Sequence, residues 1–143
     1  MIALLRHASA GDRSNWLGAD RERPLDERGR AQAEALVELL HPYEIEAIVT
    51  SPATRCRQTV EPLAHALGLQ AEVREELSEE RQWADGPPLL AGLAGTGAVV
   101  CGHGGLEAAV LGAGAPRWKK GATLVLDDAL RFVERLKPPP ANS

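Results

Sequence analysis

The sequence predicts an α/β fold, a three-layer sandwich in which a mostly parallel sheet has helices on both faces. Short apolar runs of strand length alternate with amphipathic segments of helix length along the chain. Two of these runs, 2–5 and 98–101, are continuously apolar, as is typical of strands buried on both faces. Apolar residues make up 44% of the 143 residues, which is enough for one compact core.

The first third of the chain shows this alternation. Residues 2–5 form an apolar run that we expect to be a buried strand. The polar residues 8–24 then form a loop that is longer than most connections in compact domains. Asp26 has the character of an N-cap, and apolar residues recur at helical spacing until Pro42. We therefore expect a helix over 27–41.

The remaining elements follow by the same criteria. Ser51 and Pro52 are expected to cap and open a second helix, which Gly68 ends. Two apolar arms around Asp127-Asp128 indicate an antiparallel edge hairpin, although the second arm also fits a helix. The other expected elements are strands at 45–50, 69–73 and 98–101, a polar loop or short helix at 74–81, a short helix opened by Pro87-Pro88, and a short helix ending near Leu111.

The chain shows no internal repeat and no linker, so we expect a single domain over 1–137 and a disordered Pro-rich tail over 138–143. The net charge of −4 argues against nucleic acid polymers and membrane surfaces as partners. No apolar run approaches the roughly 20 residues of a membrane span. The N-terminus becomes polar too early for a signal peptide, and a cytoplasmic location is the expectation. Cys56 and Cys101 lack metal-ligand spacing and are interpreted as buried reduced thiols.

Basic and imidazole side chains follow three of the expected strands. Arg6 and His7 follow the first strand, Arg55 begins the helix after the second, and His103 follows the fourth. In open parallel sheets, ligands bind beyond the carboxyl ends of the strands. Arginines repel a metal cation, so this group indicates an anion site rather than a metal site.

Arg55 and His103 have the more informative local contexts. Cations are disfavoured in the first turn of a helix, and a bound anion would reverse the sign of that effect at Arg55. Contact of Arg55 with water or with a nearby carboxylate would explain the residue equally well. His103 lies among Gly102, Gly104 and Gly105, which allow close backbone approach to a ligand and leave amide donors free.

Four segments carry a resemblance to a known family. Leu4-Leu5-Arg6-His7-Ala8 resembles the N-terminal signature of the histidine phosphatase (phosphoglycerate-mutase-like) superfamily, and residues 51–59 match its S-P-x-x-R-x-x-Q-T signature at every fixed position. Residues 102–105 and 23–33 are also similar to family segments. The short length and residues 120–123 most resemble the SixA-type phosphohistidine phosphatases and the phosphatase domain of some Nudix proteins.

The resemblance implies a hydrolase that uses neither a metal nor an organic cofactor. His7 would be the nucleophile and form a phosphohistidine intermediate, while Arg6, Arg55, His103 and the Gly104 backbone hold the phosphoryl oxygens. The Leu77-Ser78-Glu79 spacing matches the family's general acid, with Glu80 as an adjacent rival. The loop 8–24 lacks the Asn-containing phosphate-binding pattern of larger members, and Arg13, Ser14 or Asn15 are candidates to replace it.

The implied substrate is a phosphorylated small molecule or a phosphohistidine protein. One alternative is a non-catalytic module that binds a phosphorylated ligand without a competent acid. Another is a nucleotide-directed phosphatase that works with a Nudix-type partner.

Overall fold

The computed structural model describes residues 1–140, and the fold class predicted from the sequence is confirmed. A six-stranded sheet has the order β3-β2-β4-β1-β5-β6. The first four strands in this order are parallel, and β5 and β6 add an antiparallel edge. The strands are β1 (Ile2–Arg6), β2 (Ala47–Thr50), β3 (Ala71–Val73), β4 (Ala98–Gly102), β5 (Thr123–Leu126) and β6 (Phe132–Leu136), and the α-helices are α1 (Glu27–Leu40), α2 (Thr54–Leu67), α3 (Gln82–Leu93) and α4 (Leu106–Leu111).

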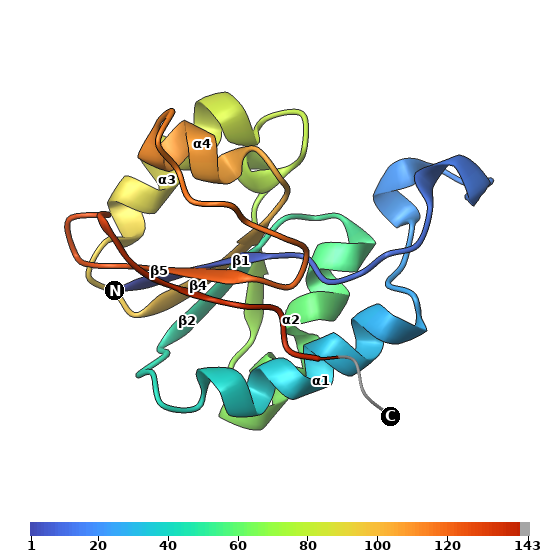
Figure 1. Cartoon of the computed structure of the whole chain (residues 1–143), viewed down its shortest axis with the longest axis horizontal. Coiled ribbons are helices and arrows are strands. Elements are labelled where there is room, and N and C mark those ends of the chain that lie inside the picture. The colour runs from blue at the N-terminus through green and yellow to red at the C-terminus, as the bar shows by residue number, and fades with distance from the viewer. Residues whose placement is uncertain (141–143) are drawn as a thin grey trace.

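Helices cover both faces of the sheet (Figure 1). On one face, Leu5 of β1 and Val99 of β4 pack with Leu36 of α1 and Val60 of α2. On the other, residues such as Leu4, Val100, Leu90, Leu106 and Trp118 form a second core under α3 and α4. Successive side chains of a strand point to opposite faces, so one continuous apolar run supplies both cores. None of the helices within residues 1–140 combines the length and the apolar character that a membrane crossing needs.

Two of the expected helix starts are wrong. The second helix begins at Thr54 rather than at Ser51-Pro52, and its N-cap residue Ala53 has no side-chain group that could form a capping hydrogen bond. The Ser51 hydroxyl lies 2.8 Å from His103 Nε2 and accepts from the Ala53 amide at 3.2 Å, so it bonds to the loop after β4 and to the turn before the helix rather than to the first turn of α2. The third helix begins at Gln82, five residues before Pro87.

Gln82 explains the earlier start of α3. Its side-chain amide donates to the carbonyls of His103 and Gly104, and its oxygen accepts from the His103 amide. These buried bonds fix the first turn of α3 to the loop after β4, and the helix then continues through both prolines.

The loop between β1 and α1 projects from the body (Figure 1) and contains two 3₁₀ turns, η1 (Arg13–Asn15) and η2 (Asp20–Glu22). A third turn, η3 (Glu75–Leu77), lies in the expected polar segment 74–81. The second hairpin arm is a strand, as one of the two expectations had it. Residues 138–140 have no regular secondary structure, and Pro139 is buried. The rest of the expected tail, 141–143, lies outside the described residues.

Candidate active site

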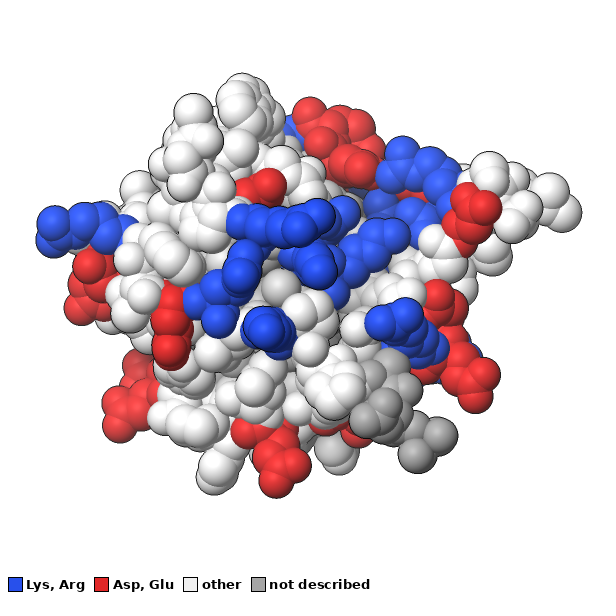
Figure 2. Space-filling view, viewed as in Figure 1, with Lys and Arg blue, Asp and Glu red and all other residues white. Residues whose placement is uncertain are grey.

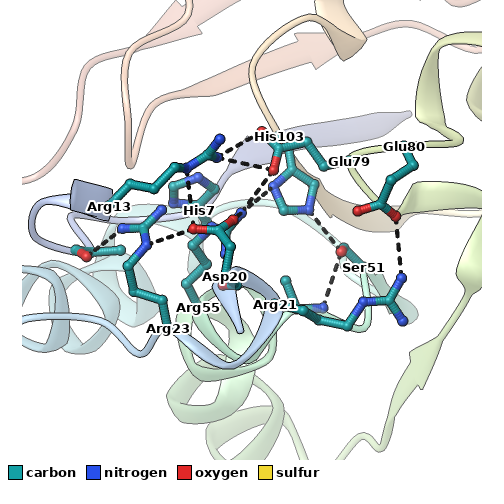
Figure 3. A network of polar contacts seen from close by, with 12 residues as sticks. His7, Arg13, Asp20, Arg21, Arg23, Ser51, Arg55, Glu79, Glu80 and His103 are labelled. Carbon is teal, nitrogen blue, oxygen red and sulfur yellow. Dashed lines mark hydrogen bonds and ion pairs between the residues drawn. The ribbon is translucent and has the colours of Figure 1, made fainter. Parts of the chain in front are cut away.

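The two histidines meet because β1 and β4 are adjacent and parallel. Arg6 pairs in register with Gly102, and the His7 amide donates to the Gly102 carbonyl at 3.2 Å. The residues that follow each strand therefore leave the sheet side by side. The rings of His7 and His103 lie 5.5 Å apart between centroids at an interplanar angle of 63°. Figure 3 shows both rings beside the side chains of Arg55 and Asp20.

One ring nitrogen of His7, Nε2, has no hydrogen-bond partner within residues 1–140. Its Nδ1 lies 2.8 Å from the carbonyl oxygen of Ala8. A carbonyl only accepts, so in the neutral ring Nδ1 carries the proton and Nε2 keeps its lone pair. The pKa of His7 is lowered to about 3, first by burial and then by the charges of His103, Arg55 and Arg6, while the bond to Ala8 opposes this shift. His7 is therefore uncharged at neutral pH.

His103 is held from two sides. Arg55 Nη2 donates to its Nδ1 at 3.4 Å, and its Nε2 lies 2.8 Å from Ser51 Oγ. Because a guanidinium only donates, Nδ1 is the acceptor and the ring proton lies on Nε2, facing Ser51. The proton position follows from these partners and fixes the orientation of the ring.

Arg55 lies in the first turn of α2, as expected, and its side chain is only 1% exposed. Its Nη1 donates to the Asp20 carbonyl at 2.9 Å, and its Nη2 contacts the Asp20 and Glu79 carboxylates at 3.2 and 3.1 Å. The contact with a nearby carboxylate, which the sequence left open, is thus present. The helix N-terminus faces negative charge, as its dipole favours.

Arg6 is positioned by a carbonyl and by a glycine. Its Nη1 donates to the Trp118 carbonyl at 2.9 Å. A Cβ on Gly104 would lie 3.0 Å from Arg6 Cζ, so the missing side chain of Gly104 makes room for the guanidinium. The Nε atoms of Arg6 and Arg55 are both buried without a partner in the described residues. Unpaired buried donors are costly, and an anion would satisfy them.

Glu79 and Arg13 lie at the site, whereas Glu80 does not. Arg13 Nη2 donates to both carboxylate oxygens of Glu79 at 3.1 Å, and Glu79 also contacts Arg55. Glu80 pairs with Arg21 at 3.2 Å, and in Figure 3 it points to Arg21 rather than toward His7. Of the two carboxylates that the sequence left as rivals, Glu79 is the one in contact with the predicted phosphate ligand Arg55.

Sequence reasoning missed Asp20 and Arg23. The Asp20 carboxylate contacts Arg55, Arg13 and Arg23, each at 3.1 or 3.2 Å. Partial burial raises its pKa, but the hydrogen bond from Arg23 and the charges of Arg55 and Arg13 outweigh this, and the net pKa is lowered. Arg23 is buried and also donates to the Ala10 carbonyl at 2.5 Å. The available signal was the excess of arginines in the loop.

Asp26 ties the start of this loop to α1. Its carboxylate accepts from the amides of Gly29 and Gly11 and from the Ser9 hydroxyl, at 2.7 to 2.9 Å. A Cβ on Gly29 would lie 1.8 Å from the Ser9 carbonyl oxygen, so only glycine fits there. The loop after His7 is therefore anchored at its base, and two of its arginines, Arg13 and Arg23, pair with Asp20 beside Arg55.

The chemistry of this cluster is that of an anion site. Arg6, Arg55 and His103 surround His7, whose free nitrogen is uncharged. Within residues 1–140, no group of three or more His, Cys, Asp or Glu side chains is arranged to hold a metal ion. The Asp20 and Glu79 carboxylates lie against the Arg55 guanidinium.

Comparison with known proteins finds phosphatases among the relatives of this chain. The 8-oxo-(d)GTP phosphatase of Mycolicibacterium smegmatis is 45% identical over 84 residues, 59% of this chain and 26% of that protein. The chain thus spans about a quarter of that relative's length. The protein histidine phosphatase SixA in complex with tungstate superposes with a TM-score of 0.78 at 25% identity, covering 96% of each chain. A SixA homologue from Agrobacterium tumefaciens gives 0.79 at 27%, covering 96% of this chain and 97% of that one.

The family itself follows from the sequence match. Residues 2–85, more than half of the chain, match the histidine phosphatase superfamily (branch 1). This stretch contains His7, Arg55 and Glu79. His103 lies outside it, and the superposition on SixA covers 96% of the chain. The chain belongs to the histidine phosphatase superfamily.

Proposed function

We propose that the protein is a metal-independent phosphatase that works through a phosphohistidine on His7. The observation that carries the proposal is the cluster in which an uncharged His7, with Nε2 free, lies among Arg6, Arg55 and His103. A neutral imidazole is a nucleophile, and fixed cationic donors stabilise the charge on a transferring phosphoryl group. The family assignment supports the same function.

The reaction has two displacements. The lone pair of His7 Nε2 attacks phosphorus and the bond from phosphorus to the leaving group breaks. The leaving group takes up a proton from Glu79, which reacts as the carboxylic acid after the phosphoryl group has displaced it from Arg55. Water then attacks the phosphohistidine and gives a proton back to the Glu79 carboxylate, the P–N bond breaks, and phosphate and neutral His7 are restored. Arg6, Arg55 and the Gly104 amide hold the phosphoryl oxygens, and Arg13 adds positive charge at the rim. His103 joins them when it carries a proton on Nδ1, which then donates to a phosphoryl oxygen in place of the bond that Nδ1 otherwise accepts from Arg55. The incoming phosphoryl group displaces the Asp20 and Glu79 carboxylates from Arg55.

Glu79 is the proposed proton donor to the leaving group. Its contacts with Arg55 and Arg13 support this role, since Arg55 is a proposed phosphate ligand. A general acid matters most for a poor leaving group. We therefore expect Glu79→Gln to slow hydrolysis of an alkyl phosphate far more than that of p-nitrophenyl phosphate. The matched variant Glu80→Gln, in which the neighbouring carboxylate paired with Arg21 is removed, should leave both rates unchanged.

The direct test is release of phosphate from p-nitrophenyl phosphate in the presence of a chelator. We expect turnover by the wild-type protein and none by His7→Ala. His65→Ala is the matched control, since His65 is exposed near the end of α2. Full activity of His7→Ala would refute the mechanism.

The natural substrate is proposed to be a phosphohistidine protein or a small phosphoester, which the resemblance to the SixA proteins supports. A nucleotide is the second candidate, because the relative that is 45% identical is named as an 8-oxo-(d)GTP phosphatase. Comparing kcat/KM for phosphohistidine, sugar phosphates and nucleotides separates these classes. Hydrolysis of nucleotides in preference to phosphohistidine would favour the second.

A further inference from the structure

A second group of basic side chains lies outside the cluster around His7. A pocket of about 400 Å³ is formed where α1, residues 117–122 and the chain from 135 to 140 come together. Five cations from these three segments line it: Arg28, Arg117, Lys119, Arg135 and Lys137. No carboxylate is among the described residues that line it.

The positive charges of these five side chains are not balanced by neighbouring carboxylates in the described residues, although the protein as a whole is acidic. None of them forms an ion pair with a carboxylate in the part of the chain that the structure describes, whereas Arg13, Arg21, Arg74 and Arg81 all do. Figure 2 shows Lys and Arg gathered across the centre of one face, with most acidic side chains around its margin. Like charges held together repel one another, and an anionic ligand would relieve this repulsion.

The pocket shares a wall with the site at His7. Trp118, whose sequence neighbours Arg117 and Lys119 line the pocket, is itself buried. Its Nε1 donates to the Ala122 carbonyl at 2.9 Å, and its own carbonyl accepts from Arg6. The Gly121 amide donates to the carbonyls of Arg6 and His7 at 3.1 and 3.0 Å. The segment that orients Arg6 therefore also presents two of the five cations.

Lys120 connects the two regions electrostatically. Its pKa is lowered first by burial and then by the charges of Arg6 and Arg23, with Asp26 opposing them. Lys120 therefore lies within the positive field of the site, and its sequence neighbour Lys119 lines the pocket.

We propose that this pocket binds the further phosphate groups of a polyphosphorylated small molecule whose terminal phosphoryl group lies at His7. The inference rests on the proposed function, and it narrows the substrate to compounds with phosphates in a chain. A concave pocket of about 400 Å³ has the size of small-molecule sites. Three of its five cations are arginines, whose planar fork matches phosphate oxygens.

Calorimetry with inorganic tripolyphosphate, phosphate and citrate tests this without relying on turnover. We expect wild-type protein to bind tripolyphosphate about tenfold more tightly than phosphate, which corresponds to about 1.4 kcal/mol. Arg117→Gln with Arg135→Gln should remove this preference and leave phosphate binding unchanged. Citrate, a polyanion with carboxylates only, should bind no more tightly than phosphate.

The matched control is Arg74→Gln with Arg131→Gln, which changes the net charge equally at two arginines that do not line the pocket. At physiological salt remote charges are screened, so tripolyphosphate binding should change less than about twofold. An equal loss in the control, equal binding of citrate, or no preference for tripolyphosphate would overturn the inference. If p-nitrophenyl phosphate is not hydrolysed but the tripolyphosphate preference depends on Arg117 and Arg135, the pocket stands and the proposed mechanism fails.

Discussion

Gly104→Ala tests how closely the site is built around the Arg6 guanidinium. The added methyl carbon would lie 3.0 Å from Arg6 Cζ and 3.1 Å from Nη2, whereas ordinary contacts begin at 3.4 Å. Arg6 must therefore shift by about 0.4 Å. Arg6 cannot move freely, because its Nη1 donates to the Trp118 carbonyl and because Arg6 is the last residue of β1, where the sheet holds its backbone. The exposed Gly104 itself has no left-handed φ, so its backbone accepts alanine.

The expected loss of activity in Gly104→Ala follows from the contribution of one hydrogen-bond donor, the Arg6 guanidinium. Removal of a whole oxyanion donor slows an enzyme by roughly 10²–10³. A shift of a few tenths of an ångström weakens the contact without abolishing it. We therefore expect kcat/KM for p-nitrophenyl phosphate to fall about tenfold, equivalent to about 1.4 kcal/mol of transition-state stabilisation.

Steady-state kinetics and thermal unfolding together check this prediction. The control is Gly92→Ala, since Gly92 lies on α3 and a Cβ added there would meet nothing within 4 Å. That variant should keep wild-type kinetics and gain about 0.5–1 kcal/mol of stability from the better helix former. Wild-type kcat/KM in Gly104→Ala would refute the argument that Arg6 is held at the phosphoryl site by this packing.

Three further predictions concern the residues around His7. In an NMR titration the His7 ring should stay uncharged to below pH 4, because its pKa is lowered to about 3. The free energy of unfolding should fall as the pH drops below about 6.5, because the unfolded chain takes up the proton first. A titration midpoint near 6.5 in the folded protein would contradict this. Arg55→Lys should lower kcat/KM by roughly 10²-fold, since lysine lacks the fork that meets Asp20, Glu79 and His103, while Arg57→Lys on the same helix should not. Ser51→Ala removes the bond between Ser51 and His103 Nε2 and leaves that nitrogen only the weaker contact with the Cys56 sulfur at 3.6 Å, which should cost about 1–3 kcal/mol in urea unfolding. Unchanged stability would contradict the importance of that bond.

The elements with continuous apolar runs were predictable, because burial on both faces leaves few polar positions. The approach of His7 to His103 was also predictable, since parallel strand ends meet at one edge of a sheet. Its geometry was not, because it depends on the pairing of Arg6 with Gly102, and strand order and register are set by tertiary packing.

The errors arose where tertiary bonds override local signals. Ser51 and Pro52 form a good local helix start, but the Ser51 hydroxyl bonds to His103 and to the Ala53 amide, and the helix begins only at Thr54. The prolines of α3 suggested a later start, but Gln82 is fixed by the loop after β4. Asp20 reaches Arg55 across 35 residues through a loop whose path no residue spacing encodes.

In the proposed mechanism His7 carries the phosphoryl group during turnover, and trapping that intermediate tests the mechanism most directly. Rapid quench of the protein with a ³²P-labelled phosphoester into alkali should trap label on His7, because phosphohistidine survives alkali and is lost in acid, and peptide mapping should find none in His7→Ala. Label on a different residue, or turnover with no labelled protein at any time point, would contradict the account.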